Sequence, residues 1–471
     1  MDAAAARGAY ADARWVERSS ERLEVVNGEV EEAADADEAG VGVRVRAGSG
    51  WGFAATGEVS RSGAQAALAR ALAMAEATGG AAGATGLAAA APARGAWRAP
   101  FEVDPFAIAL EEKLGVLLAA DEAMRGDARI VRRTATCFAQ RTTQAFASTE
   151  GAACEQTVVE CGGGLAAWAV QDGELQVRSA PMAHGGHVAQ AGWEHVAALD
   201  LVARAPGVAE EAVALLSAPP CRSGRTTVIL GGEQLALQVH ESIGHALELD
   251  RMLGLELAYA GGSWVAPDDL GSLRYGSDAL HVTADATQPS GLGTFGWDDE
   301  GVAAMRTDLI AEGVLRGALA SRESAAAAGL PASNGCMRAD GPARQPLVRM
   351  TNVSIEPGDG GTLEELIGGV REGVLLESNR SWSIDDRRLH FQFACEVGRE
   401  IRDGRLGRLV RNPSYAGVTP RFWAGLRAVC GPSEWELWGL TNCGKGEPGQ
   451  FAHVSHGAAP ARFDDVEVGA P

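Results

Sequence analysis

The chain has 471 residues, of which 46% are hydrophobic, so it is long enough for two or three domains with large cores. Charged residues make up 22% of the chain, which argues against global disorder. Lys and Arg total 41 against 62 Asp and Glu, and the resulting net charge of −21 argues against a nucleic-acid-binding protein.

The composition predicts a cytoplasmic protein. No run of about 20 apolar residues indicates a transmembrane helix, so we expect no membrane association. Residues 1–4 (Met-Asp-Ala-Ala) lack the basic region and the apolar stretch that begin a signal peptide. None of the eight cysteines forms a C-x-x-C pair, and without a secretion signal we expect reduced thiols.

The first half of the chain has the signals of an antiparallel sheet with two long helices. Asn27-Gly28 separates two apolar runs and predicts a hairpin, because both residues tolerate positive φ. Apolar residues follow helical spacing over 62–77 and over about 107–124. The other predicted segments are strands at 15–19, 22–26 and 41–45, a loop over 79–100, and a meander of strands over 130–170. We therefore predict an α+β N-terminal domain over residues 1–218.

A Pro-Pro pair at 219–220 suggests a domain boundary. We predict that residues 219–471 form a β-rich domain. A short β-branched run at 226–230 precedes a segment with helical spacing, 233–249. Beyond it, Gly-rich turns separate short apolar runs. The predicted strands are 348–355, 374–377, 389–397 and 408–411. The one prominent helix of this half thus lies at its start.

That helix contains the most informative motif of the chain, His240-Glu241-Ser242-Ile243-Gly244-His245. Zinc-protease helices carry H-E-x-x-H, with the histidines four residues apart on one face. Here the spacing is five, which in a regular α-helix leaves the two rings about 140° apart. To share a metal ion, the helix must contain a π-bulge between the histidines or end at Gly244.

The residue types fit a catalytic zinc site. Neutral imidazole is a good zinc ligand, and a catalytic zinc keeps three protein ligands and one open position. Glu241, next to the first histidine, is placed to take a proton from the attacking water and pass it to the leaving amine. The spacing leaves the third ligand open among four residues: Glu248, Asp250, His281 and Cys443.

The motif and its surroundings resemble the TldD/PmbA (TldD/TldE) peptidase family. Residues 240–248 (HESIGHALE) are similar to the family's metal-binding signature. Weaker similarities run along nearly the whole chain. They are Asn27-Gly28-Glu29-Val30-Glu31, Gly40-Val41-Gly42-Val43-Arg44, Gly52-Phe53-Ala54, Asp298-Asp299-Glu300-Gly301, Arg349-Met350-Thr351-Asn352, Cys443-Gly444-Lys445 and Val454-Ser455-His456-Gly457.

Since TldE/PmbA-like members lack H-E-x-x-x-H, this chain resembles the catalytic, TldD-like kind. The resemblance implies a zinc ion held by His240, His245 and Cys443, with Glu241 as the general base. It implies an α+β N-terminal domain followed by a β-rich domain, and a homodimer or a heterodimer with a TldE/PmbA-like chain. The implied substrates are unstructured peptides or peptide precursors. We therefore predict a zinc-dependent metallopeptidase.

Other polar clusters are given simpler interpretations. The acidic triplet Asp298-Asp299-Glu300 could hold a cation, but a solvated turn or partners for nearby arginines is the preferred interpretation. Arg349 is interpreted as a surface or salt-bridged side chain rather than a peptide-binding one. His184 and His187 are interpreted as loop residues. His453 and His456 follow Cys443 closely and are candidates for groups that support the metal ligands.

Two alternatives to a peptidase remain. The chain could be a non-catalytic partner or scaffold of a peptide-modifying complex, with a structural or vestigial metal site. Glu241 argues against that interpretation, because a structural site has no use for a base beside the ligand. A zinc hydrolase that acts on a non-peptide amide is the other alternative.

Overall fold

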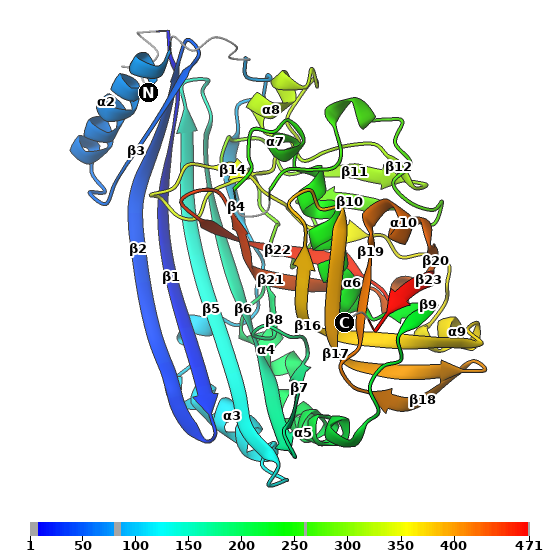
Figure 1. Cartoon of the computed structure of the whole chain (residues 1–471). Coiled ribbons are helices and arrows are strands. Elements are labelled where there is room, and N and C mark those ends of the chain that lie inside the picture. Colours follow the sequence, from blue (N-terminus) through cyan, green and yellow to red (C-terminus); the bar gives the residue numbers. More distant parts are fainter. Residues whose placement is uncertain (1–7, 80–85, 259–260, 470–471) are drawn as a thin grey trace.

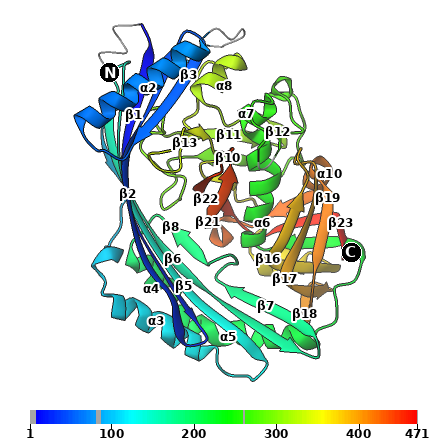
Figure 2. The same ribbon diagram turned by 60° about the vertical axis from the view of Figure 1, so that its left-hand side comes forward.

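The structure, a computed structural model, describes residues 8–79, 86–258 and 261–469. A long curved sheet forms the N-terminal part, and the C-terminal part lies against the inner side of this curve (Figures 1 and 2). The architecture confirms the predicted α+β class, with a β-rich C-terminal part. Within the described ranges, no helix has the length and apolarity needed to cross a membrane.

The N-terminal sheet has the strand order β3-β2-β1-β5-β6-β4, and β7 and β8 also pair with β6. Its pairs are antiparallel except β4 with β6. The predicted hairpin joins β1 to β2 through Asn27 and Gly28, with φ of 51° and 86°. The strands are β1 (Tyr10–Val26), β2 (Glu29–Ala47), β3 (Gly50–Thr56), β4 (Arg94–Arg98), β5 (Ile130–Ser148), β6 (Ala153–Gln171), β7 (Glu174–Ala180) and β8 (His187–Ala189).

Helices cover the outer side of this sheet (Figure 2). Both predicted long helices are present, as α2 (Arg61–Thr78) and α3 (Leu110–Ala123), and the short α4 (Trp193–Leu199) precedes α5. Leu117 of α3 and Val208 of α5 pack with Val25 in one core cluster. The structure adds α5 (Leu201–Ser217) as a third long helix, which helical spacing alone did not reveal.

The C-terminal part is built around a small barrel. Five strands pair in the order β16-β9-β23-β19-β17, and β17 pairs back with β16 to close the ring. β18 pairs with β17, and β20 pairs with β23. The elements are β9 (Gly224–Leu230), β16 (Glu372–Ile384), β17 (His390–Arg402), β18 (Arg405–Val410), β19 (Ser414–Val418), α10 (Thr419–Ala424), β20 (Leu426–Val429) and β23 (Ala461–Val468). The division near residue 218 stays a prediction; it falls between the end of α5 and the start of β9.

Shorter elements surround the barrel and hold the histidine motif. The helix that begins directly after β9 is α6 (Gly232–Val239), and its buried residues Leu235 and Val239 belong to the large C-terminal core. The remaining elements are α7 (Leu249–Met252), β10 (Val282–Asp285), β11 (Arg306–Ala311), β12 (Val314–Leu315), α8 (Arg322–Ala327), β13 (Met337–Arg338), β14 (Leu347–Val348), β15 (Val353–Ile355), α9 (Leu363–Gly368), β21 (Glu436–Lys445) and β22 (Gln450–Ala458).

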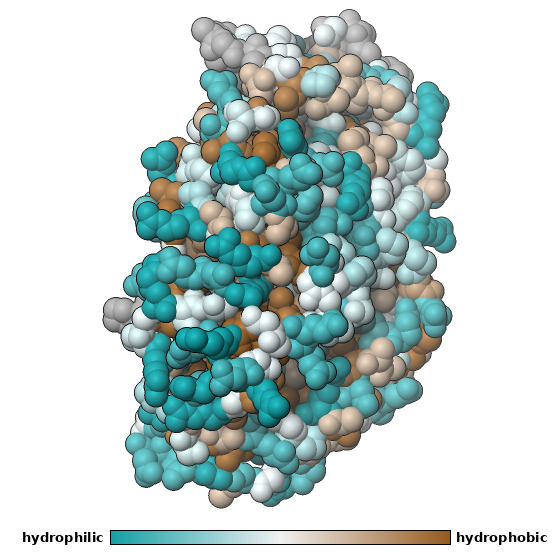
Figure 3. Space-filling model, turned by 90° about the vertical axis from the view of Figure 1, so that its right-hand side faces the viewer, coloured by the Kyte–Doolittle hydropathy of each residue, from teal (hydrophilic) through white to brown (hydrophobic). Residues whose placement is uncertain are grey.

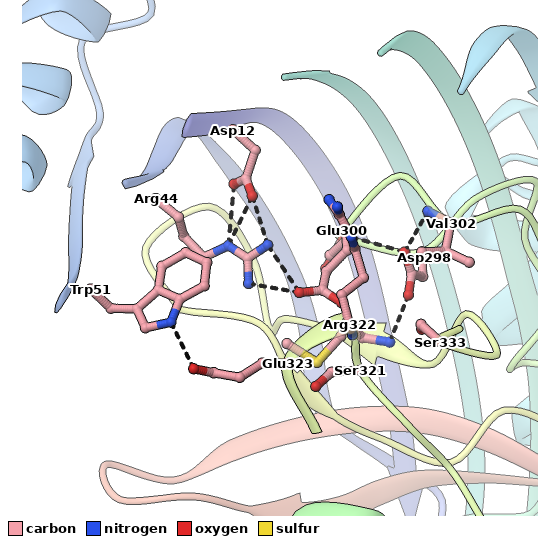
Figure 4. Close-up of polar contacts among 12 residues, drawn as sticks. Asp12, Arg44, Trp51, Asp298, Glu300, Val302, Ser321, Arg322, Glu323 and Ser333 are labelled. Carbon is pink, nitrogen blue, oxygen red and sulfur yellow. Dashed lines mark hydrogen bonds and ion pairs between the residues drawn. The ribbon is translucent and has the colours of Figure 1, made fainter. Parts of the chain in front are cut away.

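The acidic triplet (Asp298, Asp299, Glu300) joins the two parts of the molecule. It is buried, so the interpretation as a solvated turn is wrong, whereas the interpretation as partners for arginines is confirmed. Nη1 of Arg44 on β2 lies 3.5 Å from Glu300, and its Nη2 lies 2.6 Å from Asp12 (Figure 4). Oδ1 of Asp298 accepts two backbone N–H bonds at 2.9 Å (Figure 4). With these partners, the carboxylates are satisfied without a cation.

Figure 3 looks onto the face formed by the C-terminal part. Hydrophilic side chains cover most of this face, and apolar ones are scattered among them, several in a strip near its middle. This face therefore presents no broad apolar area.

Candidate metal centre

The helix that carries the histidine motif changes its winding at the first histidine. After α6, residues His240–Gly244 form a π-helical turn, in which the backbone N–H of His245 donates to the carbonyl of His240. This i to i+5 bond returns the second histidine to the side of the first. The two ring centroids lie 4.8 Å apart. Of the two distortions that the spacing allows, a π-bulge or a helix end at Gly244, the π-bulge is present.

Gly244 is required by packing at the end of this turn. A Cβ atom built on it would lie 2.0 Å from Sδ of Met350, far inside contact distance. The whole turn is buried. A larger side chain would displace either Met350 or the turn, and with the turn the neighbouring His245.

Cys443 reaches the two histidines from β21. One potential ligand atom from each of His240, His245 and Cys443 lies within 4.8 Å of the other two, and all three residues are buried. Sγ of Cys443 is 3.6 Å from Nε2 of His245. Two imidazoles and a thiolate fit a tetrahedral zinc ion that keeps its fourth position open.

The other three candidates for the third ligand lie outside this cluster. Glu248 and Asp250 both contact Lys445, whose Nζ is 3.3 Å from Glu248 and 2.8 Å from Asp250. His281 is exposed. The geometry therefore favours Cys443 as the proposed third ligand.

A chain of hydrogen bonds fixes the tautomer of His240. His456, on β22, uses Nδ1–H to donate to the carbonyl of Val353 at 2.7 Å. Its Nε2 is then an acceptor, and Nδ1–H of His240 donates to it at 2.7 Å. Nε2 of His240 is left as a lone pair for a metal ion. Burial lowers the pKa of His240 to about 4, so the ring is neutral, as a ligand must be.

A carboxylate fixes the tautomer of His245 in the same way. Nδ1–H of His245 donates to Oε2 of Glu248 at 3.1 Å, which leaves Nε2 free on the side of Cys443. Glu248 also accepts from Nε of Arg251 at 2.7 Å. Burial opposes the charge of Glu248, but Lys445 and His245 outweigh it and hold its pKa well below the usual range. A carboxylate behind the imidazole makes it a better metal ligand.

The side chain of Arg349 lies beside Cys443 and not at the protein surface. It is buried and donates to the backbone carbonyls of Cys443 and Gln450, so the interpretation as a surface or salt-bridged side chain is wrong. Burial raises the pKa of the Cys443 thiol, but Arg349 and His245 outweigh burial and lower it. The thiolate is the form that binds metals.

The candidate base Glu241 forms an ion pair with Arg388. Oε2 of Glu241 accepts from Nη1 of Arg388, and both side chains are nearly buried. Burial opposes ionisation of Glu241, but Arg388 and the two motif histidines outweigh it and lower its pKa. Arg388 is a site residue that sequence analysis missed. The run of charged residues at 385–388 between two apolar strands was the available signal.

A cavity of about 390 Å³ opens onto these groups. His240, Glu241, His245, Cys443 and Arg388 contribute to its wall. The wall also includes two exposed aromatic residues, Trp382 and Phe451, and His184 from the N-terminal part. The cavity is thus built by residues from both halves of the chain.

The other predicted histidines lie away from the ligand cluster. His184 lines the cavity, and its Nε2 is 3.0 Å from Oδ1 of Asn379. His187 bonds to the carbonyl of Leu437 at 2.7 Å. His453 bonds to Glu160 at 2.5 Å. Of the two histidines considered as supporting groups, only His456 contacts a predicted ligand among the described residues.

Three segments of the chain match domains of one family. Residues 223–470 match the PmbA/TldA metallopeptidase C-terminal domain, residues 11–75 match domain 1 and residues 103–218 match the central domain. The chain belongs to the PmbA/TldD family. Relatives of this PmbA/TldD chain carry metalloprotease names, in agreement with the resemblance noted in its sequence.

A metalloprotease of Methanothermobacter thermautotrophicus is 34% identical over 260 residues, which is 55% of this chain and 54% of the relative. A metalloprotease of Synechocystis is 29% identical over 378 residues, which is 78% of this chain and 75% of the relative. A zinc metalloprotease TldD homolog of Saccharolobus solfataricus is 27% identical over 252 residues, 53% of this chain and 52% of the relative. The matches to the first and the third of these relatives span about half of each relative's length.

Solved structures share the fold of this PmbA/TldD chain at low sequence identity. A Thermotoga maritima protein superposes with a TM-score of 0.76 at 17% identity, covering 99% of this chain and 97% of that one. TldE from Thermococcus kodakarensis superposes with a TM-score of 0.71 at 15% identity, covering 98% and 97%. At these identities the similarity concerns the fold alone.

Proposed function

We propose that this chain is a zinc-dependent metallopeptidase that hydrolyses peptide bonds in unstructured peptides or peptide precursors. The observation that carries the proposal is the cluster of His240, His245 and Cys443, with Glu241 beside it on the wall of one cavity. A purely structural zinc site has four protein ligands and no adjacent base. The metalloprotease names of the relatives support the same reaction class.

When bound, zinc supplies Lewis acidity at the open side of the ligand set. Glu241 accepts a proton from the water that attacks the peptide carbonyl and delivers it to the leaving amine. His456 and Glu248 hold the two imidazoles with their Nε2 lone pairs toward the metal position. The surrounding buried residues limit access of bulk water to these groups.

We propose that the substrate binds as an extended strand. β21 carries Cys443 and pairs with β22 alone among the described strands, so one of its edges has no strand partner. Residues Leu440, Asn442 and Gly444 of β21 line the cavity. A peptide added along this edge would form main-chain hydrogen bonds, which suit substrates of varied sequence.

Assembly and location remain predictions. A homodimer, or a heterodimer with a TldE/PmbA-like chain, is supported by the shared fold with a solved TldE. The mass of the purified protein, alone and mixed with such a chain, would decide between these states. The expected cytoplasmic location rests on the sequence.

Hydrolysis of unstructured peptides, followed by mass spectrometry, tests the proposed function. We expect cleavage that a chelator abolishes and added zinc restores. Zinc retained on a protein that cleaves no peptide, alone or with a TldE/PmbA-like chain, would favour the non-catalytic partner or scaffold. Cleavage of small amides but not of peptides would favour a non-peptide amidase.

A further inference from the structure

We propose that Arg388 is a catalytic residue, whose guanidinium binds the oxygen of the peptide carbonyl under attack. The inference rests on the proposed peptidase function and adds a residue to it. It depends on three observations: the unusual backbone of Arg388, the unused donors of its side chain, and its contact with Glu241.

The backbone of Arg388 is held in a left-handed conformation. Its φ is 61°, which is rare and costly for a residue with a long side chain. Two contacts fix it: the N–H of Arg388 donates to the carbonyl of Asp385 at 2.9 Å, and its carbonyl accepts from Oγ1 of Thr419 at 2.8 Å. Such conformations concentrate at functional sites, where they aim a side chain.

The guanidinium of Arg388 is only partly used by the protein. The residue is 5% exposed, and Nη1 donates to Glu241. Nε is buried and has no hydrogen-bond partner among the described residues. An unpaired buried donor costs free energy, so a fully satisfied guanidinium needs another acceptor. Because Arg388 lines the cavity, its guanidinium is within reach of a bound ligand.

Arg44 is a buried arginine whose guanidinium is fully used by the protein. Its Nε and Nη2 both bond to Asp12, at 3.1 Å and 2.6 Å from Oδ2, and Nη1 reaches Glu300 at 3.5 Å. Arg44 thus uses all three nitrogens in ion pairs with two carboxylates. Arg388 holds its carboxylate through one nitrogen and keeps donors for another group.

The contact with Glu241 places these donors beside the reacting atoms. A general base lies within hydrogen-bond reach of the attacking water, and here its carboxylate also touches Arg388. As the water oxygen bonds to the carbonyl carbon, its proton goes to Glu241 and the carbonyl π electrons move to oxygen. The C–N bond then breaks, and Glu241 returns the proton to the amine. Arg388 stabilises the negative oxygen between these steps, and stays charged throughout.

The test compares the wild type with Arg388→Ala and Arg388→Lys. Arg387→Ala is the matched control, because Arg387 is exposed in the same hairpin and outside the cavity wall. With zinc content unchanged, we expect kcat of Arg388→Ala to fall about 10²- to 10³-fold with KM within about threefold, as for other lost oxyanion donors. Added guanidinium should restore part of the activity. Arg388→Lys keeps the charge and should retain intermediate activity.

Binding gives a second readout. A phosphinic peptide carries the tetrahedral oxyanion, whereas a reduced-amide peptide of the same sequence does not. Arg388→Ala should weaken only the phosphinic peptide, by about the factor lost in kcat. Equal kcat and equal phosphinate affinity in wild type and variant would overturn the inference. A higher KM for free-carboxylate peptides, absent for C-terminally amidated ones, would overturn it in favour of carboxylate recognition. A wild type that cleaves no peptide would instead refute the proposed function.

Discussion

Nδ1 of His240 lies 2.7 Å from Nε2 of His456, so a side chain from β22 fixes the tautomer of the first histidine of the π-helical turn. The relationship joins residues 216 positions apart in the chain. It means that β22 helps to shape the proposed metal site although none of its residues belongs to the proposed ligand set.

His456→Ala should weaken zinc binding about 10- to 100-fold, the usual cost of losing a group that supports a ligand. Without His456, His240 loses the acceptor that keeps its Nε2 lone pair toward the metal. Competition with a chelator would measure the affinity. His187→Ala is the control, because it also removes a histidine bonded to a backbone carbonyl. Equal affinities in wild type and His456→Ala would contradict the supporting role.

The proposed ligand set predicts metal content. Purified wild type should contain about one zinc per chain, whereas Cys443→Ala and His245→Ala should lose it, since three ligands are the minimum for a catalytic site. Cys336→Ala is a matched control, because Cys336 is also a buried free thiol. Elemental analysis after zinc loading decides the matter. Zinc retained in Cys443→Ala would reopen the search among Glu248, Asp250 and His281.

Glu241→Gln should separate metal binding from turnover. The amide keeps the size of the side chain but cannot accept the proton of water, so we expect zinc to stay bound and hydrolysis to fall at least about 10²-fold. Peptide turnover and zinc content are measured on the same sample. Glu364→Gln, an exposed change of the same type on α9, provides the control. Undiminished turnover in Glu241→Gln would remove Glu241 from the role of base.

The raised pKa of Glu233 predicts that the stability of the folded chain depends on pH. Burial, with a smaller contribution from Glu396, raises its pKa to about 7, although its bond from the N–H of Ala183 opposes the shift. The folded chain then binds more protons than the unfolded chain between about pH 4.3 and 7. The stability contributed by Glu233 is therefore fully present below about pH 4.3 and is lost as pH rises through about 7.

Urea unfolding of the wild type and Glu233→Gln at pH 5.5, 6.5 and 7.5 would measure this effect. The free energy of unfolding of the wild type should fall relative to the variant by up to about 1.4 kcal/mol per pH unit. The variant keeps an acceptor for the N–H of Ala183 without a titrating group. A constant difference across the three pH values would show that Glu233 does not titrate in this range.

Local sequence signals predicted much of the fold. Ala and Leu at helical spacing predicted α2, and Asn27-Gly28 predicted the first hairpin, because both depend on neighbouring residues. α5 was missed, since Pro206 and Gly207 interrupt its helical pattern. The burial of the acidic triplet was missed as well, because it depends on Arg14 and Arg44, which are distant in sequence.

The residues of the candidate site were likewise predicted only in part from the sequence. The five-residue spacing of His240 and His245 required a change in winding, and the π-helical turn supplies it. Cys443 came from family resemblance, since spacing cannot identify a ligand 198 residues from His245. Arg388 was missed because its contact with Glu241 joins residues that lie 147 positions apart in the chain. The contact depends on how the hairpin that carries Arg388 folds over the helix.

The distance between these groups along the chain has a consequence for protein synthesis. His240 and His245 leave the ribosome long before Cys443, and His456 follows later still. A partly synthesised chain therefore carries the base and two ligands but lacks the thiolate that would complete the proposed set. With the proposed ligand set, the proposed hydrolysis would begin only after β21 has been made, so an incomplete chain would not cleave peptides.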